Sequence, residues 1–449
     1  MRNAIKIAIL AILVTGCSVY KEYERPQVKL DSLYRYVQAD TTTIAGLGWE
    51  DFFTDTLLQS LIRTGLENNV SVITARQRVI EAQANLKAAR LAYLPSVALS
   101  PTGSIANSNE RYNGTAYGFS VPLTVSWEID IAGKTFNKKR YAKAALKQAE
   151  IYELSVRTEL IAAIAEYYYT LEMLDAQLKV SETTAESWKQ NVRIMKSMKE
   201  AGMANEASVS QTEANAIAIA ASLFDLKRKI RQSENDLAAL LGIMPQAFRR
   251  GSLKDEKISD RLAAGIPVQL LSRRPDVMYA EQELRKAYYN TAYAHACFYP
   301  SLTLSGEFGW EKALTSPVGW LISAGAGLVQ PLFNRGALKA NLTTAQARQE
   351  AAAAEFRQSI INAGREVNNA LEMCYSVQHK TNLRNDQIEA LKIAEKSTRQ
   401  LMRHSESTYL EVLTAQQSLL SARLLQITDH YDAVSGVISL YKALGGGWE

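Results

Sequence analysis

A hydrophobic seam with regular four–three spacing runs through the middle of the chain and limits what it can fold into. No proline lies between Pro122 and Pro245, so nothing interrupts a helix from about residue 138 to residue 199. A sustained period of about 3.5 residues predicts coiled-coil packing rather than an ordinary globular helix. Roughly 60 residues at 1.5 Å each predict a length of about 90 Å. The seam residues are Leu160, Ile164, Tyr167, Leu171, Leu174, Leu178, Ser181, Ala185, Trp188, Val192 and Met195.

The seam is predicted to turn back on itself. Ala201-Gly202-Met203 is the expected reversal, because glycine commonly ends helices. A second seam follows over residues 223–240, and a third runs over residues 413–441 with Gln417 as its polar exception. The sequence therefore predicts two long helical hairpins.

The chain also repeats itself after about 200 residues. Tyr93-Leu94-Pro95-Ser96 returns as Phe298-Tyr299-Pro300-Ser301, and Leu241-Gly242 returns as Leu444-Gly445. A tandem duplication is the simplest explanation, with one strand pair and one hairpin in each copy. The predicted organisation is a signal peptide (1–16), an N-terminal segment (17–60), a first repeat (61–242), a linker (243–274) and a second repeat (275–449).

The strand segments alternate between apolar and polar residues, most clearly over residues 119–127 and 302–310. Each segment is about 9–11 residues long, the length of a tilted transmembrane strand. Four such strands cannot close a barrel, for which about eight is the minimum, and an open sheet would leave unpaired edges in lipid. The chain must therefore oligomerise, or the strands form the core of a soluble sandwich. Pro101 and Pro122 predict kinks or pairing defects in the sheet.

The N-terminus has the pattern of a secretory signal. Arg2 and Lys6 precede a short apolar stretch, and residues 13–17 (LVTGC) resemble a bacterial lipobox. That resemblance implies cleavage before Cys17 and acylation of this residue, which would anchor the mature chain in a membrane. Ser18 stands where an Asp would resemble an inner-membrane retention signal, so the outer membrane is favoured. The alternative is an ordinary signal peptide with an incidental cysteine.

Several classes of function are disfavoured by what the sequence lacks. A formal net charge of +5 is too small for a nucleic-acid-binding surface, and three cysteines do not form a disulfide scaffold. Gly133-Lys134-Thr135 lacks the preceding glycine of a phosphate loop, because residue 128 is Glu. No Ser/His/Asp arrangement is evident. We therefore predict no enzyme activity, cofactor or metal site. The four histidines share no metal-ligand spacing: His295, His379, His404 and His430.

Arg273-Arg274-Pro275-Asp276 is a charged cluster with two interpretations. Two adjacent guanidinium groups could bind an anion. The favoured interpretation is a helix start, with Asp276 near the positive end of the helix dipole.

Three further stretches, together with the duplication, the strand pairs and the helical seams, resemble the bacterial outer-membrane efflux proteins of the TolC-like family. The lipoprotein branch that serves tripartite pumps of the RND type is the most similar. The three stretches are residues 48–57 (GWEDFFTDTL), 265–277 (GIPVQLLSRRPDV) and 444–448 (LGGGW).

This resemblance implies a mainly α fold with a β-barrel. Duplicated coiled-coil hairpins would form a periplasmic α-barrel, and four transmembrane strands per chain would give a twelve-strand barrel in a homotrimer. The implied function is a passive exit duct for small molecules in the outer membrane. Its partners would be a periplasmic adaptor, an inner-membrane transporter of the RND type and outer-membrane lipid, with no nucleic acid. Alternatives are a periplasmic adaptor lipoprotein, which usually has one hairpin rather than two, and a lipid-anchored hydrolase.

The resemblance also places functional residues at the two hairpin ends. The adaptor contact would include Gly202, Asn205, Ser405 and Glu406. The periplasmic gate would lie at Leu410, Glu411 and Thr414. Family members often carry acids at the positions of Glu411 and Thr414, and here only Glu411 is acidic. Glu411 could instead be a residue that simply favours a helix start.

Overall fold

The two halves of the chain repeat one order of elements. The structure is a computed structural model that describes residues 20–27, 33, 46–108, 114–253, 270–312, 317–403 and 409–447. After the short helices α2 (Trp49–Phe52) and α3 (Thr56–Asn68), each half runs through a helix, strands and a helical pair. The first helix of each half has 22 residues: α4 (Val70–Leu91) and α8 (Pro275–Ala296). The long helix after the strands has 67 residues in both halves: α5 (Lys134–Glu200) and α9 (Ala337–Arg403). The last pair has 36 and 35 residues (α6, Glu206–Leu241; α10, Tyr409–Ala443), and α7 (Leu270–Arg273) is one turn.

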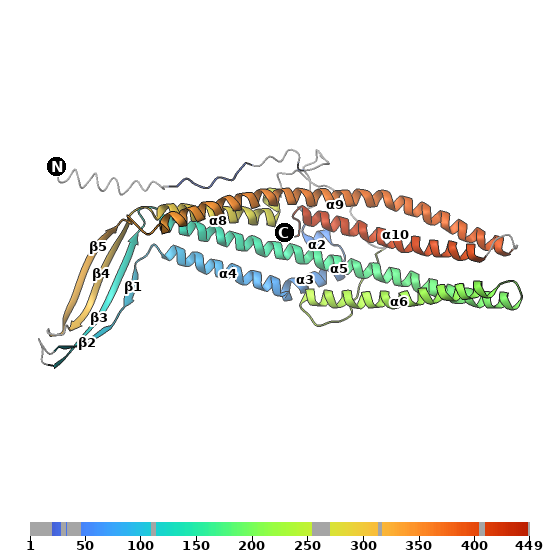
Figure 1. Ribbon diagram of the computed structural model, residues 1–449, viewed down its shortest axis with the longest axis horizontal. Helices are drawn as coiled ribbons and strands as arrows, with labels where there is room; N and C mark the ends of the chain where they lie inside the picture. The colour runs from blue at the N-terminus through green and yellow to red at the C-terminus, as the bar shows by residue number, and fades with distance from the viewer. Residues whose placement is uncertain are drawn as a thin grey trace. The chain divides into compact units, whose positions relative to one another are not determined.

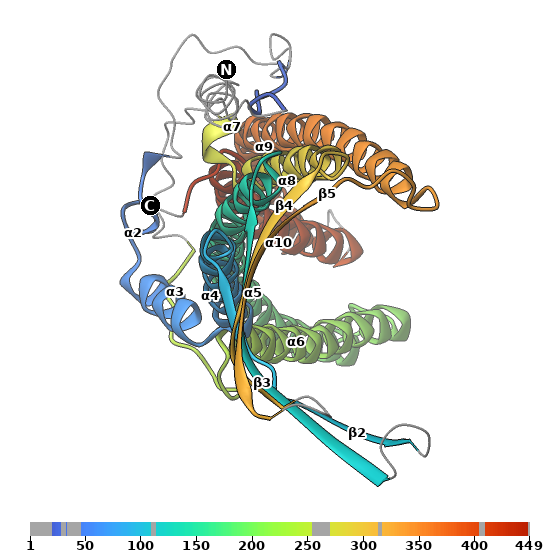
Figure 2. The ribbon, with the colours of Figure 1, turned by 90° about the vertical axis from the view of Figure 1, so that its left-hand side faces the viewer.

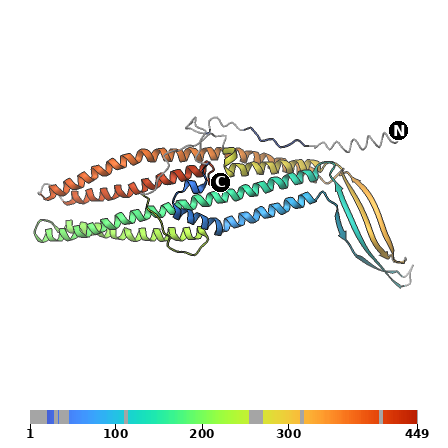
Figure 3. The ribbon, with the colours of Figure 1, turned by 180° about the vertical axis from the view of Figure 1, so that it is seen from behind.

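The described residues fall into two compact units. The sheet unit takes its residues from Met1–Val28, Gln77–Ile151 and Tyr279–Gln358, and the hairpin unit from Lys29–Arg76, Tyr152–Met278 and Ser359–Glu449. In the hairpin unit, α5 runs beside α6 and α9 beside α10 (Figures 1 and 3). The long helix predicted for residues 138–199 is thereby confirmed as α5. In the described part of the chain, no helix is both long enough and apolar enough to cross a membrane.

The core of the hairpin unit forms where α3, α5, α6 and α10 meet. Seam residues Leu160, Ile164 and Leu171 of α5 are buried here together with Leu241 of α6. Ser181, the polar member of the seam, is buried as well, whereas Gln417 of the third seam is exposed. The heptad pattern therefore located the buried face of α5 correctly.

The sheet belongs to the other unit and is antiparallel throughout. Its order is β1 (Ser96–Leu99), β3 (Gly114–Ile129), β4 (Ser301–Lys312) and β5 (Gly319–Val329), while β2 (Thr102–Ser108) also pairs with β3. Because β1 and β2 follow one another along the same edge of β3, the sheet has four strand positions, as predicted. β2 lies against the part of β3 that extends beyond β4 (Figure 2).

The two prolines explain the break between β1 and β2. Pro122 accepts a hydrogen bond from the amide of Ser100 over 3.1 Å, so its missing N–H faces the same edge, where Pro101 separates the two strands. The pairing with β4 continues without interruption through Pro122 and Gly309. A Cβ at Gly309 would lie 2.2 Å from the carbonyl oxygen of Val121, so this close approach requires glycine. The predicted pairing defect is thus confined to one edge of β3.

The strand register sorts the side chains into an apolar and a polar face. Residues paired directly across an antiparallel sheet share a face. One row of partners is Leu99, Leu123, Phe308 and Ile322, and the adjacent row on the other face is Ala98, Thr124, Glu307 and Ser323. All four residues of the first row are exposed. This alternation is typical of a strand with one face in lipid and the other in water.

Candidate functional site

The end of the first hairpin is fixed by backbone hydrogen bonds. Gly202 has a φ of 71°, and the amide of Met203 donates to the carbonyl of Met198 over 2.8 Å, closing α5. Asn205 caps α6 by accepting from the amide of Ser208 over 2.9 Å. The reversal predicted at residues 201–203 is therefore confirmed. Gly202 and Asn205, predicted as adaptor contacts, both lie in it and are exposed.

Ion pairs across the two helices hold this hairpin end together. Lys199 of α5 pairs with Glu206 in the first turn of α6, and Lys196 pairs with Glu213 over 2.7 Å. The Lys196 pKa is raised, mainly by its hydrogen bond to Glu213. All four side chains are partly exposed, so these pairs fix geometry more than they add stability.

The second hairpin end begins α10 with an exposed face at the predicted gate. Ser405 and Glu406 lie outside the described residues. Leu410 (63% exposed), Glu411 and Thr414 are exposed, while Val412, Leu413 and Ala415 are buried. The Thr414 hydroxyl donates to the carbonyl of Leu410 over 2.9 Å, so it is bonded within its own helix. The three predicted gate residues therefore share one face of the first turns of α10.

A polar chain close to this face joins three helices and was not predicted. Asn191 of α5 donates to the side-chain oxygen of Gln416 over 2.8 Å. The amide nitrogen of Gln416 in turn donates to Glu395 of α9 over 3.2 Å, and Glu395 also pairs with Arg399. Two more hydrogen bonds join α5 to α10 farther along: Gln177 to Thr428 and Thr170 to Tyr431.

Tyr409, the first residue of α10, was also missed by the sequence reasoning. Burial raises the pKa of its hydroxyl to about 12, against a smaller lowering effect of Arg399. Its Oη is buried and has no hydrogen-bond partner among the residues that the structure describes. Its position directly before Leu410 was the only sequence signal that pointed to it.

A buried carboxylate joins α9 and α10 in the middle of the second hairpin. Asp429 is 2% exposed and pairs with Lys380 at 2.7 Å and with Arg384 at 2.9 Å. Burial alone would raise the pKa of Asp429, but the two cations outweigh it and hold the pKa below its ordinary value. The carboxylate therefore stays charged at neutral pH and stabilises the helix pair.

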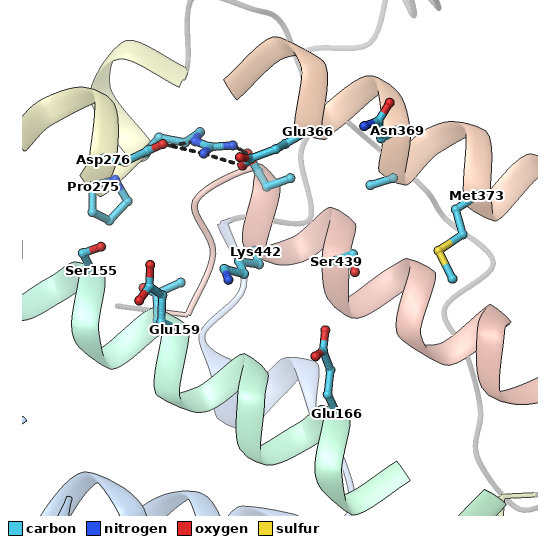
Figure 4. A pocket seen from close by; sticks show the side chains of 14 residues that line it. Ser155, Glu159, Glu166, Pro275, Asp276, Glu366, Asn369, Met373, Ser439 and Lys442 are labelled. Carbon is cyan, nitrogen blue, oxygen red and sulfur yellow. Dashed lines mark hydrogen bonds and ion pairs between the residues drawn. The ribbon is translucent and has the colours of Figure 1, made fainter. Parts of the chain in front are cut away.

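The contacts of Arg274 distinguish between the two interpretations of the charged cluster, an anion site and a helix start. Its buried guanidinium binds Asp276 at 2.6 Å and Glu366 at 2.7 Å, and donates to the carbonyl of Ala443 at 2.9 Å. Figure 4 shows Asp276 and Glu366 reaching the same group from α8 and α9, beside a cavity of about 430 Å³. Because Arg274 is already bound by two carboxylates, the structure favours the helix-start interpretation over an anion site.

The three stretches that carry the family resemblance meet in this region. Phe52, in the first stretch, stacks on Tyr441 with ring centroids 3.9 Å apart. Tyr441 and Ala443 lie just before the C-terminal stretch. The carbonyl of Ala443 accepts a hydrogen bond from Arg274 in the middle stretch. These contacts bring together three parts of the chain that are far apart in sequence. In the described part of the chain, no His, Cys, Asp and Glu side chains are grouped so as to hold a metal ion.

Comparisons with known proteins agree with this architecture. The sequence profile named "Outer membrane efflux protein" matches residues 61–243 and again residues 266–446. Cation efflux system protein CusC of Escherichia coli O6:H1 is 29% identical over 98% of each chain. Probable efflux pump outer membrane protein TtgC of Pseudomonas putida KT2440 is 28% identical, covering 100% of this chain and 96% of the relative.

Solved structures show the same fold. A crystal structure of CusC, 28% identical, matches with a TM-score of 0.85 over 96% of this chain and 100% of that one. The open state of the MtrE outer membrane channel of Neisseria gonorrhoeae, 24% identical, matches with a TM-score of 0.87 over 96% and 99%.

These similarities favour the predicted duct over the adaptor lipoprotein. The whole chain aligns with outer-membrane components of efflux systems, and the family consists of transport ducts. The predicted fold class, helical hairpins joined to a share of a β-barrel, is confirmed as well. The chain therefore belongs to the outer membrane efflux protein family and is an exit duct in the outer membrane that extends into the periplasm.

Proposed function

We propose that the duct is a homotrimer whose three sheets close into one barrel of twelve strand positions. The observation that carries this proposal is the pair of free sheet edges: within the described residues, β5 and the β1–β2 edge each pair on one side only. Unpaired backbone groups cost several kcal/mol each in lipid, so the edges must meet those of other copies. Two copies of four positions would already reach the minimum of about eight strands. Three copies give twelve positions, which is the assembly that the resemblance to the efflux family implies.

The polar face of the sheet would line a wide, water-filled pore that favours cations. In the described strands, this face carries Glu128, Glu307 and Glu311 and no Lys or Arg. Rings of carboxylates select for cations in channels. Cationic and neutral small molecules are therefore the proposed cargo, and the name of the relative CusC, a cation efflux protein, fits this class.

The hairpin ends would receive a periplasmic adaptor that links the duct to an inner-membrane transporter of the RND type. Gly202 and Asn205 are exposed on a rigid reversal, which suits a docking surface. Ser405 and Glu406 complete the proposed contact at the second hairpin end. Leu410, Glu411 and Thr414 would form the constriction at the tunnel mouth, with Leu410 as the apolar barrier and Glu411 as the acidic ring.

Two measurements test this proposal together. Native mass spectrometry of the purified protein should give three chain masses, and heat should convert the trimer to monomer on a gel. A cysteine introduced as Asn205→Cys should crosslink to the adaptor in cells. The matched control, Asn235→Cys on the exposed surface of the same helix, should not crosslink. A monomer in the native spectrum would refute the closure argument, and crosslinks from residue 235 alone would place the adaptor elsewhere.

A further inference from the structure

The helices next to the sheet enclose a strongly basic cavity. It has a volume of about 710 Å³ and is lined by α4, α5, α8 and the N-terminal residues Glu22 and Tyr23, all within the sheet unit. Its walls carry six basic side chains and only two acidic ones, Glu22 and Glu150. The basic residues are Arg90, Lys139, Arg140, Lys143, Lys147 and Arg285.

Internal partners satisfy only part of this charge. Arg140 pairs with Glu22 at 3.2 Å, and Lys147 pairs with Glu150 at 3.1 Å. Arg285 lies 3.8 Å from Glu281 and stacks over Tyr23, which leaves its buried Nε without a hydrogen bond in the described chain. Two of the remaining basic side chains, Arg90 and Lys143, are exposed and make no ion pair within the described chain, so the cavity keeps an excess of positive charge.

A buried amide gives a second and independent sign of a ligand. Gln282 lines the cavity from α8 and is 7% exposed, yet its Oε1 has no hydrogen-bond partner among the described residues. A buried polar atom without a partner costs about 1–3 kcal/mol, so such atoms are normally satisfied. Oε1 is an acceptor, so a ligand that satisfies it would bring an N–H or O–H donor, and one that also matches the basic walls would carry an anionic group.

The cavity lies close to the ends of the strands. β1 and β4 begin, and β3 and β5 end, at the same end of the sheet. The helices α4, α5, α8 and α9 follow or precede the strands there. α5 begins at Lys134, so Lys139 and Lys147 lie roughly 8 and 20 Å along the helix from its start.

Exposed aromatic side chains indicate that this end of the sheet lies at the membrane surface. Trp127, Phe298 and Tyr299 are exposed here, and the indole of Trp127 donates to the carbonyl of Tyr93 over 2.9 Å. Such aromatic belts sit at the head-group level of a bilayer. Lys139 lies 5.1 Å above the ring of Tyr93, which connects the belt to the cavity.

We propose that this cavity binds the phosphodiester head group of a phospholipid from the periplasmic leaflet of the outer membrane. Arg90 and Lys143, which make no ion pair within the described chain, would hold the phosphate, because arginine and lysine are the usual phosphate ligands. Gln282 would accept from the hydroxyl of a glycerol head group or the ammonium of an ethanolamine head group. Choline, which has no such donor, would leave Gln282 unsatisfied.

The test is native mass spectrometry of the full-length protein with lipids of matched acyl chains. Phosphatidylglycerol should bind at one molecule per chain and about tenfold more tightly than phosphatidylcholine. The double variant Arg90→Gln/Lys143→Gln should lose about tenfold in affinity for phosphatidylglycerol. Gln282→Leu should reduce the preference for glycerol over choline and retain most of the affinity that comes from charge.

The control removes one lysine and one arginine from the sheet-proximal part of a helix outside the cavity. Lys339 and Arg348 are exposed in the sheet-proximal part of α9 and do not line the cavity, so Lys339→Gln/Arg348→Gln should retain full binding. Equal binding by all four proteins would overturn the proposal. Displacement of the lipid by millimolar inorganic phosphate would assign the cavity to a free anion instead. Loss of the oligomer in the Arg90/Lys143 variant would show that a neighbouring copy fills the cavity.

Discussion

The side-chain amide of Asn191 donates to Gln416 over 2.8 Å, so the first hairpin holds the second close to the proposed gate. Gln416 lies only a few residues after Leu410 and Glu411 on α10. Any outward movement of this part of α10 away from α5 must break the bond. The bond therefore restrains this part of α10 in the arrangement that the structure shows.

Asn191→Ala should make the duct open more readily. A hydrogen bond contributes about 1 kcal/mol net, so its loss should shift the closed-to-open ratio about fivefold. Conductance in planar bilayers measures the effect. Gln417→Ala is the control, since Gln417 is exposed on the next position of α10. Equal conductance of both variants and the wild type would show that the bond does not restrain opening.

Leu410→Ala should raise the small conductance of the closed duct, because an apolar ring gates by excluding water. The substitution removes most of a side chain that is 63% exposed and lies outside the core. The fold should be retained, which circular dichroism can verify. An unchanged closed conductance would place the constriction elsewhere.

Glu411→Gln should lower the cation selectivity and weaken block by multivalent cations about fivefold, the effect of one nearby unit charge in water. Reversal potentials and block curves measure both. Glu200→Gln removes the same charge from the exposed end of α5 and should change neither. If both variants behave alike, Glu411 is only a residue that favours the helix start.

Asp429→Asn should lower the free energy of unfolding at pH 7 by about 3 kcal/mol, since it leaves Arg384 and Lys380 without their shared carboxylate. The folded-state pKa of Asp429 is depressed, so its stabilising effect is full above the ordinary Asp pKa. That effect is lost as the pH falls through the folded-state value. Melting curves should therefore converge for wild type and variant at low pH. Asp386→Asn, an exposed change on α9, should leave the melting temperature unchanged at every pH.

Cys17 should be the first residue of the mature chain and should carry acyl groups, which mass spectrometry of the N-terminal peptide can detect. Cys17→Ala should weaken membrane attachment and leave the strands able to insert. Cys297→Ala, at the sheet end of α8, should affect neither property. An unmodified peptide that runs through Gly16 and Cys17 would contradict the prediction.

The sequence predicted the elements whose signals are local. The proline-free heptad seam placed α5 to within a few residues at each end, and the period-two alternation found the strands. The length of β3 was underestimated, because Gly114, Gly118 and Pro122 weaken its pattern over 16 residues. The break between β1 and β2 was foreseen as a defect at Pro101, but its confinement to one edge depends on the register with Pro122.

The contacts between hairpins were beyond sequence reasoning. Asn191 and Gln416 are 225 positions apart, and the heptad seams give the buried face of each helix but not which residues of the two helices meet. The same holds for Gln282, whose isolation depends on how α8 packs against α4 and α5. The gate residues were placed at the start of the last helix by the family resemblance. Their common face on α10 follows because Leu410 and Glu411 lie four and three positions before Thr414.

The free edges of the sheet have a consequence for inheritance. A ring of identical subunits joined head to tail closes only if every joint forms, so one copy with a damaged β5 edge spoils the ring that it enters. In the proposed trimer, a cell that makes intact and damaged chains in equal amounts would have about one ring in eight that consists of intact chains alone. Mutations in β5 that leave the hairpins folded should therefore be dominant.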